Sequence, residues 1–315
     1  MNILVWHVHG SWTTAFVQGD HHYILPVLPD RGPDGRGRAR TWDWPDAAVE
    51  RTPGELRDTD IDLVILQRPE DEVLADEWLG RRPGRDVPAI WLEHNAPQGT
   101  INELRHPAAD RRDLTIVHVT HFNALFWDCG STVTRVIEHG IIDPGYRYTG
   151  EMERAAVTVN EPVRRARVAG TDLLAPLSRA VPLDVFGMGV GAVKAERIEV
   201  FEDLPQDRLH AEMARRRVYL HPFRWTSLGL SLLEAMHLGM PVVALGTTET
   251  PEVVPPEAGV VSNRPDVLAE ALRRLTAEPE EARVLGKAGR EAALDRFGLN
   301  RFLSDWNDLL QEVTS

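Results

Sequence analysis

The sequence predicts two doubly wound α/β domains, each built on a parallel sheet with helices on both faces. Three observations support this fold class. A chain of 315 residues is longer than one ordinary hydrophobic core serves. Short apolar runs rich in β-branched residues alternate with helical stretches, which is typical of parallel sheets buried on both faces. The alternation occurs in two successive series, which indicates two domains.

The first series contains six expected strands. They are residues 2–8, 23–28, 61–67, 87–93, 114–119 and 134–139. Helical or polar stretches lie between them, including residues 69–80 and 120–128. Residues 30–46 (DRGPDGRGRARTWDWPD, here called the arginine loop) are rich in Gly, Pro and Arg. This composition predicts a mobile surface loop, which could form a lip over a cleft.

The second series contains six further expected strands and a helical C-terminal tail. The strands are 155–160, 182–188, 197–201, 217–221, 241–245 and 259–261, and the helices are 206–216, 227–238, 266–277 and most of 278–315. Around residues 141–154, Pro, Gly and Tyr replace the periodic pattern. We therefore expect an N-terminal domain over 1–145, a second domain over 146–296 and a terminal helix over 297–315.

Composition excludes several classes of function. A net charge of −13 argues against a nucleic-acid binder, which needs a basic face. Cys129 is the single cysteine, so there is neither a disulfide framework nor a thiolate metal cluster, and we expect it to be a small buried residue. The N-terminus enters a strand-like run without a basic leader, and Glu234, His237 and Pro241 interrupt the most apolar window, 228–245. We expect a cytoplasmic protein with at most peripheral membrane contact.

The segment RWTSLGLSLLEAMHLGMPVVALG (224–246) carries the clearest chemical signal. A helix N-terminus presents unpaired N–H groups and partial positive charge, and Gly229 would let an anion approach its backbone and that of Leu230. Glu234 lies five residues on, roughly 7–8 Å along the axis. This spacing fits a diphosphate at the helix start and a ribose at the carboxylate. The alternative is a core helix whose glutamate contacts an internal group.

The surrounding residues resemble a known family. RVYLHP, TSLGLSLLEAMHLGMPVVA and TETPEVVPPEAGVV (217–261) occur in the order found in the donor-binding half of retaining family-4 glycosyltransferases, which have the GT-B fold. The resemblance extends upstream and is looser over residues 1–135. It implies two Rossmann-like domains facing a cleft, and a terminal helix that crosses back to the first domain. It also implies transfer of a sugar, with retention, from a nucleoside-diphosphate sugar to a hydroxyl acceptor (a glycan, a lipid-linked sugar or a small molecule), without a metal or other cofactor.

In the second half, the resemblance assigns one position that departs from the family and one cationic segment. Thr226 stands where the first glutamate of the family's Glu-x7-Glu motif contacts the transferred sugar; a hydroxyl can hydrogen-bond but brings no charge. The family clamps diphosphate with an Arg and a Lys after the first strand of the second domain. Here Arg164, Arg165 and Arg167 are available, and we favour Arg165 for neutralising the leaving diphosphate.

In the first half, the resemblance assigns a histidine and a glycine-containing loop. His94 follows a buried strand in WLEHNAP and corresponds to a histidine that faces the transferred sugar. Gly10 and Ser11, in HGSW after the first strand, correspond to the family's loop near the donor phosphate and the acceptor. GMGVGA (187–192) matches a dinucleotide fingerprint literally, but it lies mid-chain before a strand. We interpret it as the family's glycine turn.

Two alternatives remain open from the sequence. His7 and His9 lie on alternate positions at a strand end, as in metal-dependent amidohydrolase barrels; His118 and His121 would supply part of the remaining ligand set. The other alternative is a nucleotide-sugar-binding protein that has lost turnover, and Thr226 is the residue that favours it.

Overall fold

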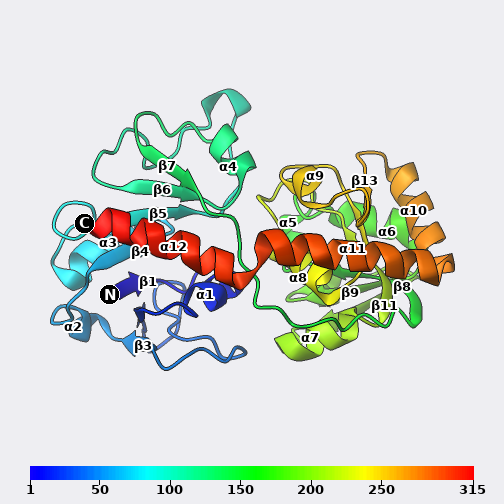
Figure 1. Cartoon of the computed structure of the whole chain (residues 1–315), viewed down its shortest axis with the longest axis horizontal. Coiled ribbons are helices and arrows are strands. Elements are labelled where there is room, and N and C mark those ends of the chain that lie inside the picture. Colours follow the sequence, from blue (N-terminus) through cyan, green and yellow to red (C-terminus); the bar gives the residue numbers. More distant parts are fainter. The chain divides into compact units, whose positions relative to one another are not determined.

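The computed structural model describes all residues, Met1–Ser315, and divides into two compact units. Unit 1 consists of Met1–Ile141 and Leu299–Ser315, and unit 2 consists of Ile142–Gly298 (Figure 1). The sequence placed the two boundaries after residues 145 and 296. Each unit is built on one sheet in which every strand pair is parallel. The prediction of two doubly wound parallel sheets is therefore confirmed.

The sheet of unit 1 has seven strands in the order β3-β2-β1-β4-β5-β6-β7. The strands are β1 (Asn2–Val5), β2 (His22–Pro26), β3 (Ala48–Arg51), β4 (Leu63–Leu66), β5 (Ala89–Glu93), β6 (Thr115–His118) and β7 (Val133–Val136). The sequence analysis missed β3. Its four residues, AVER, form no apolar run, and only Ala48 is buried, because this edge strand has a neighbour on one side only.

Unit 1 has five helices and one 3₁₀ turn. They are α1 (Gly10–Phe16), α2 (Pro53–Leu56), α3 (Pro69–Leu79), η1 (Ile101–Glu103), α4 (His121–Phe126) and α12 (Leu299–Thr314). We expected the segment around Gly10 to be a loop, and instead α1 begins there. Five consecutive residues of α1 are buried, from Trp12 to Phe16, so tertiary burial stabilises this short helix.

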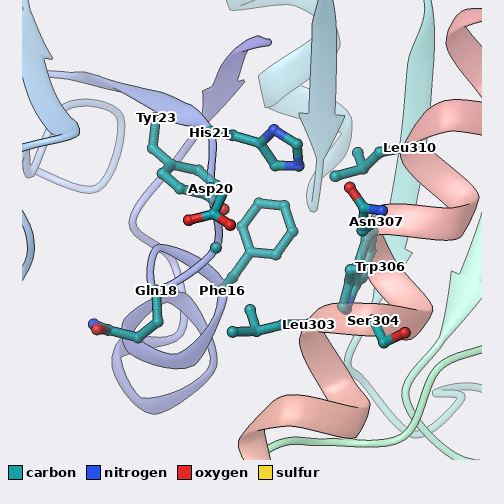
Figure 2. A pocket seen from close by; sticks show the side chains of 11 residues that line it. Phe16, Gln18, Asp20, His21, Tyr23, Leu303, Ser304, Trp306, Asn307 and Leu310 are labelled. Atoms are coloured by element: carbon teal, nitrogen blue, oxygen red, sulfur yellow. The ribbon is translucent and has the colours of Figure 1, made fainter.

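Helix α12 completes unit 1 although it comes last in the chain (Figure 1). Trp306 is buried, and its ring centroid lies 5.6 Å from that of Trp12 and 5.0 Å from that of Phe16. Close to this contact is a cavity of about 230 Å³, lined by α12, the end of α1 and the turn into β2. Figure 2 shows Phe16, Tyr23 and Trp306 among its lining side chains. The last helix of the chain thus covers the apolar side of the first.

The structure ties the arginine loop to the sheet, which differs from the mobile loop that we expected. The guanidinium of Arg31 donates to both carboxylate oxygens of Glu50 on β3, at 2.8 and 3.0 Å. Arg38 donates to the backbone carbonyls of Trp44, Pro45 and Ala48. The indole of Trp44 donates to the Thr14 hydroxyl at 2.8 Å. These buried or half-buried contacts fix the loop over the β1–β3 side of the sheet.

Unit 2 has a six-stranded sheet in the order β10-β9-β8-β11-β12-β13. The strands are β8 (Met152–Thr158), β9 (Leu183–Gly187), β10 (Ile198–Glu202), β11 (Arg216–His221), β12 (Val242–Ala244) and β13 (Gly259–Val261), all at or within a few residues of the expected positions. The helices are α5 (Pro162–Arg165), α6 (Thr171–Ser178), α7 (Gln206–Met213), α8 (Leu230–Leu238), α9 (Thr250–Val253), α10 (Pro265–Ala277) and α11 (Pro279–Phe297), with a 3₁₀ turn η2 (Val190–Ala192).

The helical tail consists of two helices. Gly298 is extended, with φ −65° and ψ 143°, and separates α11 from α12. No helix in the structure combines the length and the apolar character needed to cross a membrane.

The strand orders determine where each unit can bind a ligand. In both sheets, the first three strands run from a central strand to one edge, and the later strands are added on the other side of that central strand. This reversal lies between β1 and β4 in unit 1 and between β8 and β11 in unit 2. In open parallel sheets, loops at the carboxyl ends of the two strands flanking such a reversal diverge and leave a binding crevice.

Gly286 in α11 provides a test of the packing in unit 2. A Cβ at this position would lie 2.0 Å from the carbonyl oxygen of Gly239, at the end of α8. Backbone cannot move aside as a flexible side chain can, so Gly286→Ala should cost about 1–3 kcal/mol of unfolding free energy. In Gly191→Ala, the added Cβ meets only a carboxylate at 3.5 Å, and stability should change little. Urea unfolding of both variants measures the difference; equal stability would contradict the close approach of the two helices.

Candidate functional site

In unit 2, the strand-order reversal brings together the start of α8 and the segment after β8. Helix α8 has Gly229 as its N-cap, which offers no side chain to bond the N–H groups of the first turn. Leu230 is the first helical residue and is partly exposed. A helix of nine residues carries a partial positive charge at this end. The start of α8 is therefore suited to an anion.

The structure gives Gly229 a packing role beside the anion contact that the sequence predicts for it. Its backbone is extended, with φ −75°, which any residue can adopt. A Cβ there would lie 2.5 Å from Cε1 of His221, the last residue of β11. The absence of a side chain thus lets the helix start lie directly against this imidazole.

His221 is a neutral, buried histidine below the helix start. It is 1% exposed, and its ring stacks on Phe223 at 4.7 Å between centroids. Neither ring nitrogen has a hydrogen-bond partner. Burial, and secondarily the charge of Arg165, lowers its pKa to about 3. The imidazole therefore adds polar nitrogen atoms but no charge to this part of the unit.

Three arginines follow β8, and the structure distinguishes them. Arg164 and Arg167 are largely exposed and lie beside acids, Glu161 at 3.5 Å and Asp172 at 3.0 Å. Arg165 ends α5, is half-buried, and lies with its guanidinium carbon 5.1 Å from the centre of the Phe223 ring. Burial first, and then the charge of Arg164, lowers the pKa of Arg165. A desolvated cation of this kind gains most from an anionic ligand.

Glu234 lies on the buried side of α8, one and a half turns from its start. The carboxylate is 5% exposed, and one of its oxygens lies 3.5 Å from Nε2 of His210 on α7. His210 is 6% exposed, and its Nε2 is also 2.7 Å from Nε2 of Gln206. The carboxylate thus has an internal neighbour, while its distance from the helix start still fits a diphosphate-to-ribose step. Thr226 is partly exposed in the loop that leads from β11 to α8.

In unit 1, His94 lies between the rings of two other histidines. His94 directly follows β5, and its ring centroid is 4.1 Å from that of His9 and 6.5 Å from that of His139. Its Nε2 lies 3.0 Å from Oε1 of Gln67, which directly follows β4. Burial, and then the two neighbouring histidines, holds the pKa of His94 well below its ordinary value of 6.5. His94 is thus neutral near pH 7, aligned by an amide, and able to exchange hydrogen bonds with a ligand.

The segment after β1 lies at the same edge of the sheet. His7 Nδ1 is 3.0 Å from the carbonyl oxygen of Gly37 in the arginine loop. His7 Nε2 lies 3.7 Å from the position that a Cβ on Gly10 would take. Gly10 and Ser11 form the first turn of α1, so both follow β1 directly and lie on the side of the reversal.

The barrel alternative is wrong. It required a closed ring of eight strands, and the structure has two open sheets of seven and six strands. His118 lies in the core of unit 1, with Nε2 at 3.5 Å from Sγ of Cys129, and His121 is an exposed first residue of α4. Cys129 is buried as expected, and burial raises the pKa of its thiol to about 11.

Comparison with known proteins finds a family match within unit 2. Residues 193–292 match the family model described as Glycosyl transferases group 1. Sulfoquinovosyl transferase SQD2 from Arabidopsis thaliana is 31% identical over 118 residues, which is 33% of this chain and 23% of that protein. The chain spans between 23% and 32% of the length of the curated relatives that it matches.

Solved structures are similar over the whole chain. Sucrose-phosphate synthase from Thermosynechococcus elongatus superposes with a TM-score of 0.76, at 15% identity, over 99% of this chain and 98% of that one. Anabaena HepE in complex with UDP gives a TM-score of 0.69, at 12% identity, over 99% and 100%. At these identities the likeness concerns the fold, and the predicted GT-B fold is confirmed.

The sequence analysis missed three neighbours of the site. His139 and Gln67 follow two strands of the sheet, and polar residues at strand ends are a signal that could have been used, because such ends share one edge. His210 gave no comparable signal. It lies in the middle of an ordinary polar helix, and only the folded unit brings it against Glu234.

The contact between Gly229 and His221 can be tested by a double-mutant cycle. Gly229→Ala places a Cβ against the buried ring, so it should destabilise unit 2 by about 1–3 kcal/mol. In a His221→Ala background the space is open, and the same substitution should cost less than about 0.5 kcal/mol. Denaturant unfolding of the four proteins gives the coupling. An equal cost in both backgrounds would show that the glycine is required for another reason.

The buried histidines of unit 1 predict a loss of stability in mild acid. Burial is the main cause that lowers the pKa of His9 to about 4 and that of His139 to about 3. Arg36 and Arg68 add to the shift of His9, and His9 and Arg301 add to that of His139. Between these values and the ordinary 6.5, the unfolded chain binds more protons, so stability is complete above pH 6.5 and falls as the pH drops towards 4. Each group contributes about 1.4 kcal/mol per pH unit within its window.

Urea unfolding between pH 7.5 and 5 measures this slope. His9→Gln removes one titrating group and should reduce the slope relative to the parent protein. If the slope is the same in both proteins, His9 is not held neutral by the fold.

Proposed function

We propose that the protein is a retaining glycosyltransferase of the Glu-x7-Glu type, related to family 4. It would transfer a sugar from a nucleoside-diphosphate sugar to a hydroxyl acceptor, with unit 2 binding the donor. The observation that carries this proposal is the half-buried Arg165, which lacks an acidic partner and contacts Phe223 beside the start of α8. It lies at the strand-order reversal of a unit whose residues 193–292 match a glycosyltransferase family.

In the proposed complex, the diphosphate lies at the start of α8. The N–H groups of Gly229 and Leu230 and the guanidinium of Arg165 would neutralise its charge. This charge is what builds up on the leaving group during transfer, so the same contacts would stabilise the transition state. An arginine and a helix dipole provide the compensation for which other enzymes use a cation, and we propose that no metal is required.

Glu234 would accept hydrogen bonds from the ribose hydroxyls. Its distance along α8 from the helix start supports this role, and ribose would then compete with His210 for the carboxylate. HepE, one of the structurally similar proteins, was solved with UDP, which supports a nucleotide donor without identifying the base for this chain.

Retention at the anomeric carbon would follow from attack on the face that the diphosphate leaves. The bond from the anomeric carbon to the phosphate oxygen breaks, a bond to the acceptor oxygen forms, and the acceptor proton passes to that phosphate oxygen. We propose that neutral His94 hydrogen-bonds the transferred sugar or positions it. Thr226 would provide one hydroxyl to the sugar, and Gly10 and Ser11 would line the approach of the acceptor.

A second function is favoured by a specific residue. Thr226 brings no carboxylate to the position where the family has one. A protein with this change could bind nucleotide sugars without transferring them.

Calorimetric binding of UDP, GDP and ADP, with and without a chelator, tests both functions. One nucleotide should bind with the chelator present. Arg165→Gln should weaken its binding about tenfold or more, because a charged hydrogen bond to the diphosphate is lost, and Glu234→Ala should also weaken it. Arg164→Gln and Arg167→Gln are matched controls, since these arginines already lie beside acids, and they should change affinity less than about threefold.

The outcomes separate the alternatives. Binding followed by release of nucleoside diphosphate from a donor sugar supports the enzyme. Binding without any release in the presence of hydroxyl acceptors supports the non-catalytic protein. If none of the three nucleotides binds, the donor site is wrong.

A further inference from the structure

Unit 1 contains a cation that the proposed function does not use. The arginine loop carries four arginines, Arg31, Arg36, Arg38 and Arg40. Arg31 is paired with Glu50, and the guanidinium of Arg38 donates hydrogen bonds to backbone carbonyls. Arg36 is exposed, and its guanidinium has no carboxylate partner. Because its two paired neighbours fix the loop, Arg36 is held on an ordered backbone.

The backbone places Arg36 beside the histidines that follow β1. Arg36 forms an antiparallel bridge with Val27, and the carbonyl of the next residue, Gly37, lies 3.0 Å from His7 Nδ1. After burial, the charge of Arg36 is the next cause that lowers the pKa of His9, and it also lowers the pKa of His7. Two backbone contacts thus hold Arg36 between the end of β2 and the segment that follows β1.

The other nearby cation is already neutralised. Arg68 also acts on His9, but its guanidinium contacts Asp71 at 2.6 Å and Asp34 at 3.3 Å. Arg36 is therefore the positive charge at this edge that remains available to a ligand. The imidazole of His7 lies against Gly10, and the ring of His9 contacts that of His94 with a centroid distance of 4.1 Å. A molecule bound by Arg36 would lie along the same edge as the residues assigned to the transfer reaction.

We propose that Arg36 binds an oxyanion, a phosphate or a carboxylate, carried by the acceptor substrate. This inference rests on the proposed function, because it assumes that unit 1 binds the acceptor. Arg165 in unit 2 is the cation proposed for the donor diphosphate, so we assign Arg36 in unit 1 to another negative group. The acceptor is then an anionic molecule with a free hydroxyl, and Arg36 determines the preference for it over neutral molecules.

The experiment uses inorganic phosphate and acetate as probes, with glucose as the uncharged comparison. The donor site is first saturated with whichever nucleoside diphosphate binds, so that the probes do not occupy it. Binding is followed through the imidazole ¹H–¹⁵N resonances of His7 and His9, assigned by single substitution. The variants are Arg36→Gln and the matched control Arg40→Gln, an exposed arginine of the same loop whose charge is not among those acting on either histidine.

The expected result is a saturable shift of the His7 and His9 resonances with at least one anion and none with glucose. Phosphate acting alone would assign a phosphorylated acceptor, and acetate acting alone a carboxylate. Arg36→Gln should raise the dissociation constant tenfold or more, and Arg40→Gln should change it less than twofold. A transfer assay with glucose 6-phosphate, glucuronate and glucose should then favour the matching anion in the parent protein and lose this preference in Arg36→Gln.

The inference is overturned if neither anion shifts these resonances, or if Arg36→Gln binds as tightly as the parent. It is also overturned if Arg36→Gln weakens nucleotide binding instead, because Arg36 would then serve the donor. Failure of the proposed function gives a different pattern. In that case no nucleotide binds, whereas the response of His7 and His9 to anions still depends on Arg36.

Discussion

The parallel alignment of the strands within each sheet is the constraint on which both units depend. It directs every carboxyl end to one edge, and the reversal of strand order opens a gap between two of those ends. In unit 2 the gap receives the start of α8 and Arg165. In unit 1 it receives the segment after β1 and Gln67. Residues far apart in sequence come together there because the carboxyl ends of parallel strands share one edge of the sheet.

Burial gives these collected side chains their chemistry. The imidazoles of His9, His139 and His221 are held neutral because a charged ring would lose its hydration. The same desolvation lowers the pKa of Arg165, which remains a cation because an arginine does not lose its proton near neutral pH. Each unit thus combines uncharged hydrogen-bonding rings with an arginine that lacks an acidic partner. Such a combination suits a neutral sugar next to a negatively charged group.

The sheets could be predicted well from the sequence because most of their strands are short apolar runs that can be recognised locally. LVIL in β4 is buried at all four positions, and a continuous apolar run of this kind indicates a strand buried on both faces. AVER in β3 could not be recognised, because an edge strand needs little apolar surface. The short helices α5 and α6 were missed for a related reason. Helix α5 has only four residues, and α6 has eight residues and a proline, Pro176, in its interior, so neither shows a clear helical pattern.

The part of the site that could be predicted is the part that depends on local sequence, and contacts between distant segments could not be predicted. The spacing from Gly229 to Glu234 is fixed by one helix and could therefore be predicted from the sequence. We favoured Arg165 over Arg164 and Arg167, but no local pattern distinguishes the three. Their surroundings depend on which side chains reach Glu161, Asp172 or Phe223 after folding. Two further contacts could not be predicted, because each joins elements that come together only on folding. They are the contact of His210 with Glu234 and the close approach of Gly229 to His221.

The position of α12 in unit 1 has a consequence for folding during synthesis on the ribosome. Unit 2 is one continuous segment, whereas unit 1 needs residues from both sides of it. Trp306 is synthesised only after unit 2. Until then, the apolar surface formed by Trp12 and Phe16 remains exposed. Unit 2 can thus fold before unit 1 is complete, and the incomplete unit 1 exposes apolar surface, which favours aggregation.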